Sequence, residues 1–251
     1  MPEAKLLAAL FLALLFASAI VRAALMRRQV RHVLARRDTV PPAFADAIGL
    51  ASHQRAADYT VARMGLALPE LAVSTALVLG LTLGGGLQWL HDAWAGVAEA
   101  GGIAHGVVLL ASLAVIGWLL ELPFTLWRTF VVEKRFGFNR MTPALFIADT
   151  VKEGLLAALV GLPLLAAVLW LMQAMGATWW LWVWALWLGF NLLFMLVWPT
   201  FIAPLFNTFT PLADQALKAR VETLLARCGF RSRGLFVMDG SRRSAHGNAY
   251  F

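Results

Sequence analysis

The sequence predicts an all-α polytopic membrane protein with five transmembrane helices, followed by the start of a soluble α/β domain. Hydrophobic residues make up 61% of the 251 residues and charged residues only 14%, whereas a typical soluble domain has about 45–50% and about 25%. The mean hydropathy is +0.73. The apolar residues also gather in five long runs. Together these observations argue against a soluble globular enzyme and against a disordered chain.

Each of the five apolar runs is long enough to cross a bilayer. A hydrocarbon core about 30 Å thick needs roughly 20 apolar residues in a helix. The runs are too long and too weakly alternating for barrel strands, so helices are the structure that satisfies their backbones in lipid. The expected spans are residues 6–26, 66–90, 103–126, 155–175 and 179–201. They define a transmembrane domain over residues 1–203, with loops at about 27–65 and 127–154.

The first run also has features of a secretory signal peptide. Lys5 precedes a long apolar stretch that contains Ala17-Ser18-Ala19, a small-residue triplet typical of cleavage sites. The apolar run continues past the triplet, however, and stops only at Arg27 and Arg28. We therefore expect an uncleaved membrane anchor.

The basic residues predict the orientation of the helices. The net charge is +7 and the pI is about 10.5, but with this hydropathy the charge indicates cytoplasmic loops and not nucleic-acid binding. Seven Lys or Arg lie in residues 27–63, five in 127–154 and seven after residue 203, while residues 91–102 and 176–178 contain none. The positive-inside rule places the basic segments in the cytoplasm and the N-terminus outside. Five spans from an outside start also deliver a cytoplasmic tail.

The tail, residues 204–251, has the pattern of a soluble domain. Thr210 and Pro211 suit an N-cap and a first helical position, and Gly229 suits a C-terminal cap. We expect an amphipathic helix at about 211–228 and strands at about 234–238 and 248–251. One helix and two strands are too small to bury a core of their own, so we interpret the tail as the start of a larger domain.

No catalytic or metal-binding motif is evident in the chain. The single cysteine, Cys228, excludes an internal disulfide and a multi-cysteine zinc site. No two of the five histidines are four residues apart, as HExxH requires, and GxSxG, P-loop and dinucleotide motifs are absent. Ser241 and Ser244 lie near His246, but a turn-rich polar loop explains them better than a nucleophile and its base. The histidines are His32, His53, His91, His105 and His246.

A few polar side chains interrupt the apolar spans. Glu70 and Glu121 lie near predicted cytoplasmic helix ends, where water can reach them or where they can line a polar chamber. Asn191 lies deeper, and we expect it to hydrogen-bond between helices. Six tryptophans in the fifth span fit an aromatic belt and a packing surface better than a ligand cage. Gly84-Gly85-Gly86 is expected to permit close helix packing.

Several stretches resemble one family of membrane enzymes. They are residues 40–44 (VPPAF), 53–60 (HQRAADYT), 121–124 (ELPF), 129–139 (TFVVEKRFGFN), 203–212 (APLFNTFTPL) and 239–251 (DGSRRSAHGNAYF). The chain is similar, from about residue 40 to its end, to integral-membrane zinc metalloendopeptidases of the CAAX prenyl protease 1 type. The RFGFN and HGNAYF parts of these stretches are long and specific.

This resemblance implies a fold, a cofactor and a site. Members have seven membrane helices around a large chamber, and a cytoplasmic HExxH helix with a later glutamate binds zinc at its mouth. Substrates are the C-terminal tripeptide of prenylated CaaX proteins, or membrane peptides more generally. The NAYF stretch is similar to an edge strand that holds substrate backbone, although an ordinary buried strand also fits its hydrophobicity. The substrate-side residues implied by the resemblance are His246, Asn248, Ala249, Tyr250 and Phe251.

The chain departs from the family pattern at its end. The 251 residues contain no HExxH, no later glutamate ligand and no last two helices, so we expect this chain alone neither to bind catalytic zinc nor to cleave peptides. It is interpreted as the N-terminal membrane portion of such a protease, with a non-catalytic membrane binding module as the alternative. The expected partners are the lipid bilayer and, with a catalytic part present, a peptide or prenylated protein C-terminus; no nucleic acid is expected. A bacterial inner membrane and an endoplasmic reticulum membrane fit equally.

Overall fold

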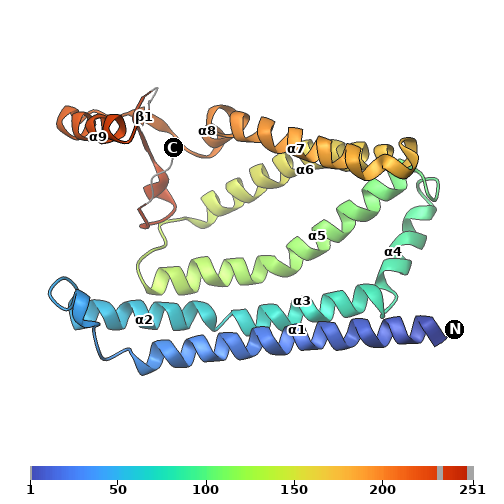
Figure 1. Ribbon diagram of the computed structural model, residues 1–251, viewed down its shortest axis with the longest axis horizontal. Helices are drawn as coiled ribbons and strands as arrows, with labels where there is room; N and C mark the ends of the chain where they lie inside the picture. Colours follow the sequence, from blue (N-terminus) through green and yellow to red (C-terminus); the bar gives the residue numbers. More distant parts are fainter. Residues whose placement is uncertain (1, 231–233, 248–251) are drawn as a thin grey trace. The chain divides into compact units, whose positions relative to one another are not determined.

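The structure, a computed structural model, describes residues 2–230 and 234–247 and is mostly helical (Figure 1). Five helical segments within these residues are long and apolar enough to cross a membrane, which confirms the five predicted spans. They are Glu3–Ala35, Leu50–Thr82, Ile103–Glu133, Pro143–Ala174 and Gly176–Phe206. Each of these segments is longer than its predicted apolar run. The chain forms two compact units, Met1–Asn139 and Arg140–Phe251.

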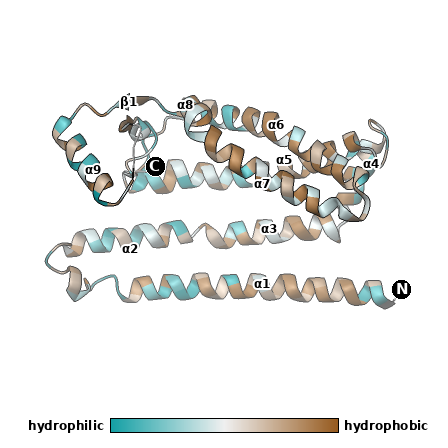
Figure 2. Cartoon of the chain, turned by 45° about the horizontal axis from the view of Figure 1, so that its top comes forward, coloured by the Kyte–Doolittle hydropathy of each residue, from teal (hydrophilic) through white to brown (hydrophobic). Residues whose placement is uncertain are grey.

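The first unit begins with two long helical segments that lie side by side. Helix α1 (Pro2–Ala35) packs along α2 (Leu50–Met64) and α3 (Ala67–Thr82), as Figures 1 and 2 both show. A short 3-10 turn, η1 (Pro42–Phe44), lies in the connection between them. The expected loop at 27–65 is therefore largely helical, because α1 continues to Ala35 and α2 begins at Leu50.

The glycine run at 84–86 ends a helix, contrary to the expectation that it permits packing inside a span. Helix α3 stops at Thr82, and Gly85 has φ +76°, a left-handed conformation that favours glycine. A Cβ on Gly84 would lie 2.7 Å from the carbonyl oxygen of Gly80. The chain then turns into a separate helix, α4 (Gly86–Ala95), so the second span does not continue to residue 90.

The last helix of the first unit ends in π-helical backbone. Helix α5 (Ile103–Trp127) contains Pro123 in its final turns and continues into the π-helix η2 (Arg128–Glu133). Proline lacks the amide N–H that a regular α-helix needs, and π-helical segments are frequent at functional sites. Gly137, with φ +80°, turns the chain after η2.

The second unit contains an antiparallel pair of long helices. Helix α6 (Pro143–Ala174) begins at Thr142, whose side chain accepts a hydrogen bond from the Leu145 amide at 3.2 Å. Such an N-cap contributes about 1 kcal/mol. The turn η3 (Gly176–Thr178) leads directly into α7 (Trp179–Val197), which contacts α6. The π-helix η4 (Trp198–Ile202) and the short α8 (Ala203–Phe206) follow.

The tail differs from expectation at the start of its helix. Helix α9 (Gln215–Arg227) begins four residues later than predicted because Asp214, and not Thr210, is its N-cap. The Asp214 carboxylate accepts hydrogen bonds from the amides of Ala216 and Leu217 at 2.9 and 3.0 Å. Thr210 and Pro211 instead lie in a strand. The helix ends near Gly229, whose φ of +75° suits a C-terminal cap.

Two short strands connect the parts of the tail. Strand β1 (Phe209–Pro211) pairs antiparallel with β2 (Phe236–Met238), with Thr210 opposite Val237. The Leu212 amide extends the ladder to the Leu235 carbonyl at 2.9 Å, so β pairing replaces the helix start that the sequence favours locally. Strand β2 is shorter than the predicted 234–238 and leads into the 3-10 turn η5 (Gly240–Arg242). The strand expected at 248–251 lies outside the described residues.

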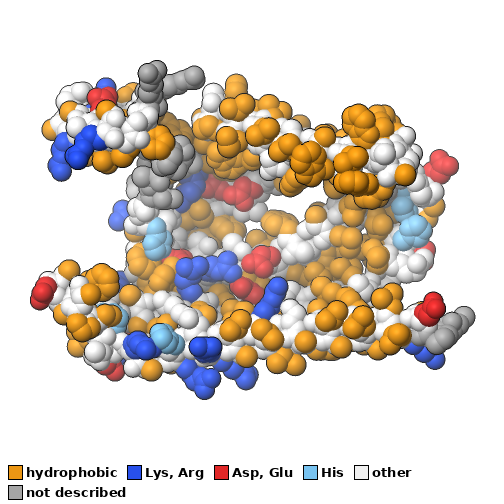
Figure 3. All heavy atoms as spheres, in the orientation of Figure 1, with side chains coloured by type: hydrophobic (Ala, Val, Ile, Leu, Met, Phe, Trp, Pro, Cys, Tyr) orange, Lys and Arg blue, Asp and Glu red, His pale blue; other side chains and the backbone are white. Residues whose placement is uncertain are grey.

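The apolar side chains mostly face outward. Leu14, Leu159 and Trp184 are 63%, 74% and 63% exposed, and Figure 3 shows many hydrophobic side chains on the surface of α7. Such exposure would be unfavourable in water but is expected where lipid is the solvent. The buried apolar side chains within the described residues are Ala57, Leu90, Val132, Phe136, Leu171, Ile202 and Ala203.

Candidate functional site

The segment that leads to the predicted substrate-side residues is an exposed turn after β2. His246 lies in this segment and is exposed, and its backbone amide donates a hydrogen bond to Ser244 Oγ at 3.1 Å. Asn248, Ala249, Tyr250 and Phe251 lie outside the described residues. The role assigned to these five residues therefore stays a prediction, and the described structure bears on what holds the segment in place.

A bidentate ion pair ties this segment to α6. Arg243 donates from Nε and Nη2 to the two carboxylate oxygens of Asp149 at 2.7 and 3.0 Å, and from Nη1 to Asn207 Oδ1 at 3.0 Å. The side chains of Arg243 and Asp149 are only 20% and 8% exposed. The hydrogen bonds to Asp149 raise the pKa of Arg243 above its usual value, so the guanidinium stays charged. The backbone of Arg243 also accepts a hydrogen bond from the Arg140 amide at 3.1 Å.

A second contact holds the same segment next to β1. Asp239 Oδ1 accepts a hydrogen bond from the Thr208 amide at 2.8 Å, and the Asp239 amide donates to the Thr208 carbonyl at 3.1 Å. The Thr208 hydrogen bond, with the nearby Arg242 guanidinium 3.4 Å away, lowers the pKa of the Asp239 carboxyl. Further along, Lys152 Nζ donates to the Leu205 carbonyl at 3.0 Å and so links α6 to α8. Residues 207–208 and 239–243 thus form one hydrogen-bonded platform before His246.

The first unit brings together two of the stretches that carried the resemblance. Tyr59, in HQRAADYT, donates a hydrogen bond from its hydroxyl to Glu133 Oε1 at 2.6 Å. Its ring meets those of Phe136 and Phe138 edge-on, at 5.2 and 4.9 Å between centroids. Arg55 Nη2 donates to the Phe136 carbonyl at 2.6 Å. The RFGFN stretch is therefore an ordered turn fixed against α2.

The two glutamates near span ends converge on one arginine. Arg128, at the start of η2, forms an ion pair with Glu70 and lies 3.7 Å from Glu121. Glu70 is the less exposed carboxylate, at 25% against 53% for Glu121. Helix-end solvation alone does not explain them, since each has a protein partner. Asn191 Nδ2 donates to the Trp187 carbonyl of its own helix at 2.7 Å, not across helices as expected.

Two histidines expected at an interface or in a solvated loop form a pair. His105 is 3% exposed, and its Nε2 lies 2.9 Å from Nδ1 of His91. Next to them Trp94 Nε1 donates to Ser112 Oγ at 2.9 Å. Both contacts join α4 to α5. The histidines therefore contribute to packing of these helices.

The comparisons with known proteins identify the family. Residues 29–208 match the family described as "CAAX prenyl protease N-terminal, five membrane helices". The chain belongs to this family. The match covers more than half of the chain and includes both HQRAADYT and RFGFN.

Curated relatives and a solved structure agree with this assignment. The CAAX prenyl protease 1 homolog of Oryza sativa is 40% identical over 156 residues, which are 62% of this chain and 37% of that protein. The probable CAAX prenyl protease 1 of Schizosaccharomyces pombe is 29% identical over 239 residues, 90% of this chain and 50% of that protein. The crystal structure of S. mikatae Ste24p superposes with a TM-score of 0.85 at 28% identity and covers 95% of this chain and 56% of that one.

The chain spans about half the length, or less, of the CAAX prenyl protease relatives it matches. A peptidase of this family implies zinc in the intact enzyme. Within residues 2–230 and 234–247, however, no three His, Cys, Asp or Glu side chains gather where they could hold a metal ion. The described residues therefore do not by themselves fit a catalytic zinc centre.

The residues that hold the segment were not identified as such from the sequence. From the sequence, Asp149 falls in the predicted loop at about 127–154, and Arg243 is one of the seven basic residues after residue 203. An acidic residue next to a long apolar run requires a partner, and this is the signal that indicates Asp149. Its partner is 94 residues away in the chain, so only the structure pairs them.

Proposed function

We propose that this chain is the membrane portion, with part of the substrate-binding strand, of a CAAX prenyl protease 1-like zinc metalloendopeptidase. It would form part of the chamber wall and present residues 246–251 to the C-terminal peptide of a prenylated or membrane protein. The observation that supports this most directly is the Asp149–Arg243–Asn207 contact, which anchors the chain immediately before His246. The matches to CAAX prenyl proteases supply the substrate class.

The role of the chain's own residues in such a reaction is to bind and orient. An extended peptide can add to a strand edge through backbone hydrogen bonds, which give affinity without strict sequence requirements. The platform at 207–208 and 239–243 would fix the position of that edge, since a substrate misplaced by about 1 Å can cost about a hundredfold in rate. Zinc, in the intact enzyme, would polarise the scissile carbonyl and activate water.

A chimera tests this proposal. Residues 1–251 replace the matching part of the S. pombe relative, whose alignment covers 90% of this chain, and the remainder of that protein completes the enzyme. We expect membranes containing the chimera to release the C-terminal tripeptide of a farnesylated CaaX peptide, and a chelator to abolish release. We expect none from residues 1–251 alone. A chimera that is inserted and folded, but does not cleave, would support a non-catalytic binding module instead.

The platform is tested in the same chimera. Arg243→Ala removes both contacts of the guanidinium and is expected to reduce cleavage at least about tenfold, because the peptide edge loses its position. The matched control is Arg220→Ala. This change also removes one positive charge, from an exposed side chain of α9. Equal activity of the two variants, at equal amounts of folded protein, would contradict the positioning role.

The proposal that Ala249 binds the substrate through its backbone is tested by removing its amide N–H. Ala249→Pro removes one amide donor and is expected to raise KM, whereas Ala249→Val keeps the donor and is the control. A substrate peptide that is N-methylated at the peptide bond opposite Ala249 loses one backbone donor, and its KM should also rise. If Ala249→Pro leaves KM unchanged while Tyr250→Ala raises it, the segment binds through side chains and strand addition is wrong.

We also propose that the tail is cytoplasmic, on the strength of the basic loops. The single cysteine, Cys228, is exposed at the end of α9 and is a natural reporter. A membrane-impermeant maleimide should label it in inside-out vesicles and not in right-side-out vesicles. Labelling only in right-side-out vesicles would reverse the proposed topology.

A further inference from the structure

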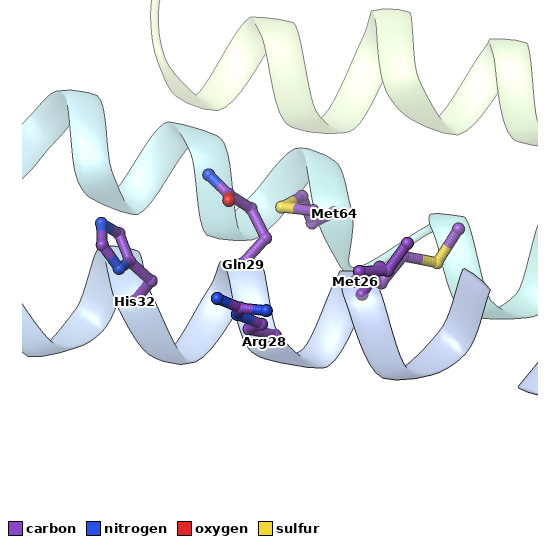
Figure 4. A pocket seen from close by; sticks show the side chains of 6 residues that line it. Met26, Arg28, Gln29, His32 and Met64 are labelled. Atoms are coloured by element: carbon purple, nitrogen blue, oxygen red, sulfur yellow. The ribbon is translucent and has the colours of Figure 1, made fainter. Parts of the chain in front are cut away.

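A groove of about 550 Å³ lies on the first unit, where the C-terminal half of α1 approaches the end of α2. Figure 4 shows Arg28, Gln29 and His32 along α1, with Met64 of α2 facing them and Met26 at one end. Its size is that of a site for a small molecule or part of a lipid. The residues that line it are Leu25, Met26, Arg28, Gln29, His32 and Met64.

The groove lies where both of its helical segments change from apolar to polar. In α1 the apolar run ends at Met26, and a cluster of basic residues, Arg27, Arg28 and Arg31, follows it. In the α2–α3 segment, the polar α2 ends at Met64 and the apolar α3 begins at Ala67. Figure 2 shows this change along α1. A transition of this kind marks the depth of the lipid headgroups, so the apolar end of the groove faces acyl chains and the polar end faces phosphates.

Among the described residues, no carboxylate pairs with the arginines at the polar end of the groove. Within the part of the chain that the structure describes, Arg27, Arg28 and Arg31 make no hydrogen bond or ion pair, and the only acidic residue of α1 is Glu3 at its far end. Figure 3 shows Lys and Arg side chains gathered over this half of α1. By contrast, Arg37 is paired with Asp58.

The polar groups of the groove are spaced to share one face of α1. Arg28 and His32 are four residues apart and therefore neighbours on the helix surface. Arg36 Nη1 in turn donates to the imidazole of His32, and it lies 2.6 Å from Nδ1 and 2.8 Å from Nε2. The guanidinium of Arg36 is therefore a second positive charge next to the groove. None of the residues that line the groove carries a carboxylate.

We propose that this groove is a binding site for one anionic phospholipid. The phosphate binds Arg28 and the Arg36–His32 pair, and the glycerol ester accepts from Gln29. One acyl chain lies on Leu25, Met26 and Met64. Arginine suits this role because its guanidinium matches a phosphate with two parallel hydrogen bonds. The ligand is a lipid and not a soluble anion, because half of the lining is apolar and lies at membrane depth. This site is separate from residues 243–251 and does not depend on the proposed peptidase function.

Native mass spectrometry of the whole purified chain tests the site, with phosphatidylglycerol as the probe. We expect one phosphatidylglycerol molecule to be retained per chain, in preference to phosphatidylcholine of the same acyl length. Arg28→Ala should weaken retention about fivefold, the effect of one basic residue near an anionic surface. Arg27→Ala and Arg31→Ala are matched controls, since they remove the same charge from the same helix but do not line the groove.

The other outcomes would overturn the proposal. Equal losses in Arg27→Ala, Arg28→Ala and Arg31→Ala would mean that the basic end of α1 attracts lipid without a defined site. Equal retention of phosphatidylcholine would exclude recognition of the headgroup charge. Displacement by inorganic phosphate, with no effect of Met64→Gln, would mean that the groove binds an anion and not a lipid.

Discussion

Two ion pairs of the same geometry, one in each unit, differ in burial. Arg37 donates hydrogen bonds from Nε and Nη2 to the carboxylate oxygens of Asp58 at 2.7 and 2.9 Å. Arg243 donates from the same two atoms to the carboxylate oxygens of Asp149 at 2.7 and 3.0 Å. The side chains of the first pair are 33% and 43% exposed, and those of the second are 20% and 8% exposed. The hydrogen-bond pattern alone would rank the pairs equally.

Solvent access, and not hydrogen-bond geometry, determines how much stability is lost when one partner of a pair is removed. An exposed ion pair is worth about 0–1 kcal/mol, because water screens it and solvates either partner alone. In a buried pair, the loss of one partner leaves a charge without solvation and costs about 3–5 kcal/mol. Loss of one partner of the Asp149–Arg243 pair is therefore expected to cost more stability than loss of one partner of the Arg37–Asp58 pair.

The largest effect is expected from Asp149→Ala. It leaves the mostly buried Arg243 guanidinium with Asn207 as a hydrogen-bond partner but without its paired carboxylate, so the free energy of unfolding should fall by about 3–5 kcal/mol. An SDS unfolding titration in mixed micelles measures this. Asp58→Ala is the matched control, since it removes the same group from the exposed pair. Equal losses in the two variants would show that burial does not distinguish the pairs.

An intermediate effect is expected from Tyr59→Phe. This change keeps the edge-on ring contacts with Phe136 and Phe138 and removes only the hydroxyl that donates to Glu133. A hydrogen bond to a charged group contributes about 1.5–3 kcal/mol, and the same unfolding titration should show that loss. Tyr59→Leu should cost more because the ring contacts go as well. If Tyr59→Phe is neutral, the ring packing alone orders the RFGFN turn.

A smaller effect is expected at the exposed pair itself. In a double-mutant cycle of Arg37→Ala and Asp58→Ala, the coupling energy should be at most about 1 kcal/mol and should fall as salt is added. The same cycle on Arg243 and Asp149 should give a larger coupling that salt changes little. A coupling at Arg37–Asp58 that is large and independent of salt would remove the contrast between the two pairs.

The features that depend on local sequence were predicted well. Hydropathy located all five membrane helices, because about 20 apolar residues in a row leave few alternatives in lipid. The resemblance carried by RFGFN and its neighbours indicated the family, which the family match confirms. The C-terminal cap at Gly229 also followed from the sequence, since few residues other than glycine adopt its φ of +75°.

The features that depend on distant contacts were not predicted. Thr210 and Pro211 have the local signature of a helix start, but pairing with Val237 and Phe236 places them in a strand. Likewise, Asp239 contacts Thr208, which is 31 residues away in sequence, and no local pattern indicates this contact. Local propensity is a weak prior that tertiary pairing overrides, and one sequence gives no information about such pairings.

The smallest effect is expected at Asp239, where pH changes the contact without a substitution. Its pKa is lowered from 3.8 in the folded state, mainly by the Thr208 amide. The stabilisation is therefore fully present above that value and is lost as the pH falls through the lower folded pKa. Hydrogen exchange should show lower protection of the Thr208 amide in this acid range, while the Thr223 amide inside α9 keeps its protection. Asp239→Asn should remove the pH dependence, because its amide does not titrate there. Unchanged protection of Thr208 in acid would mean that β1–β2 pairing holds this segment without the carboxylate, and that the Asp149–Arg243 pair is its main anchor.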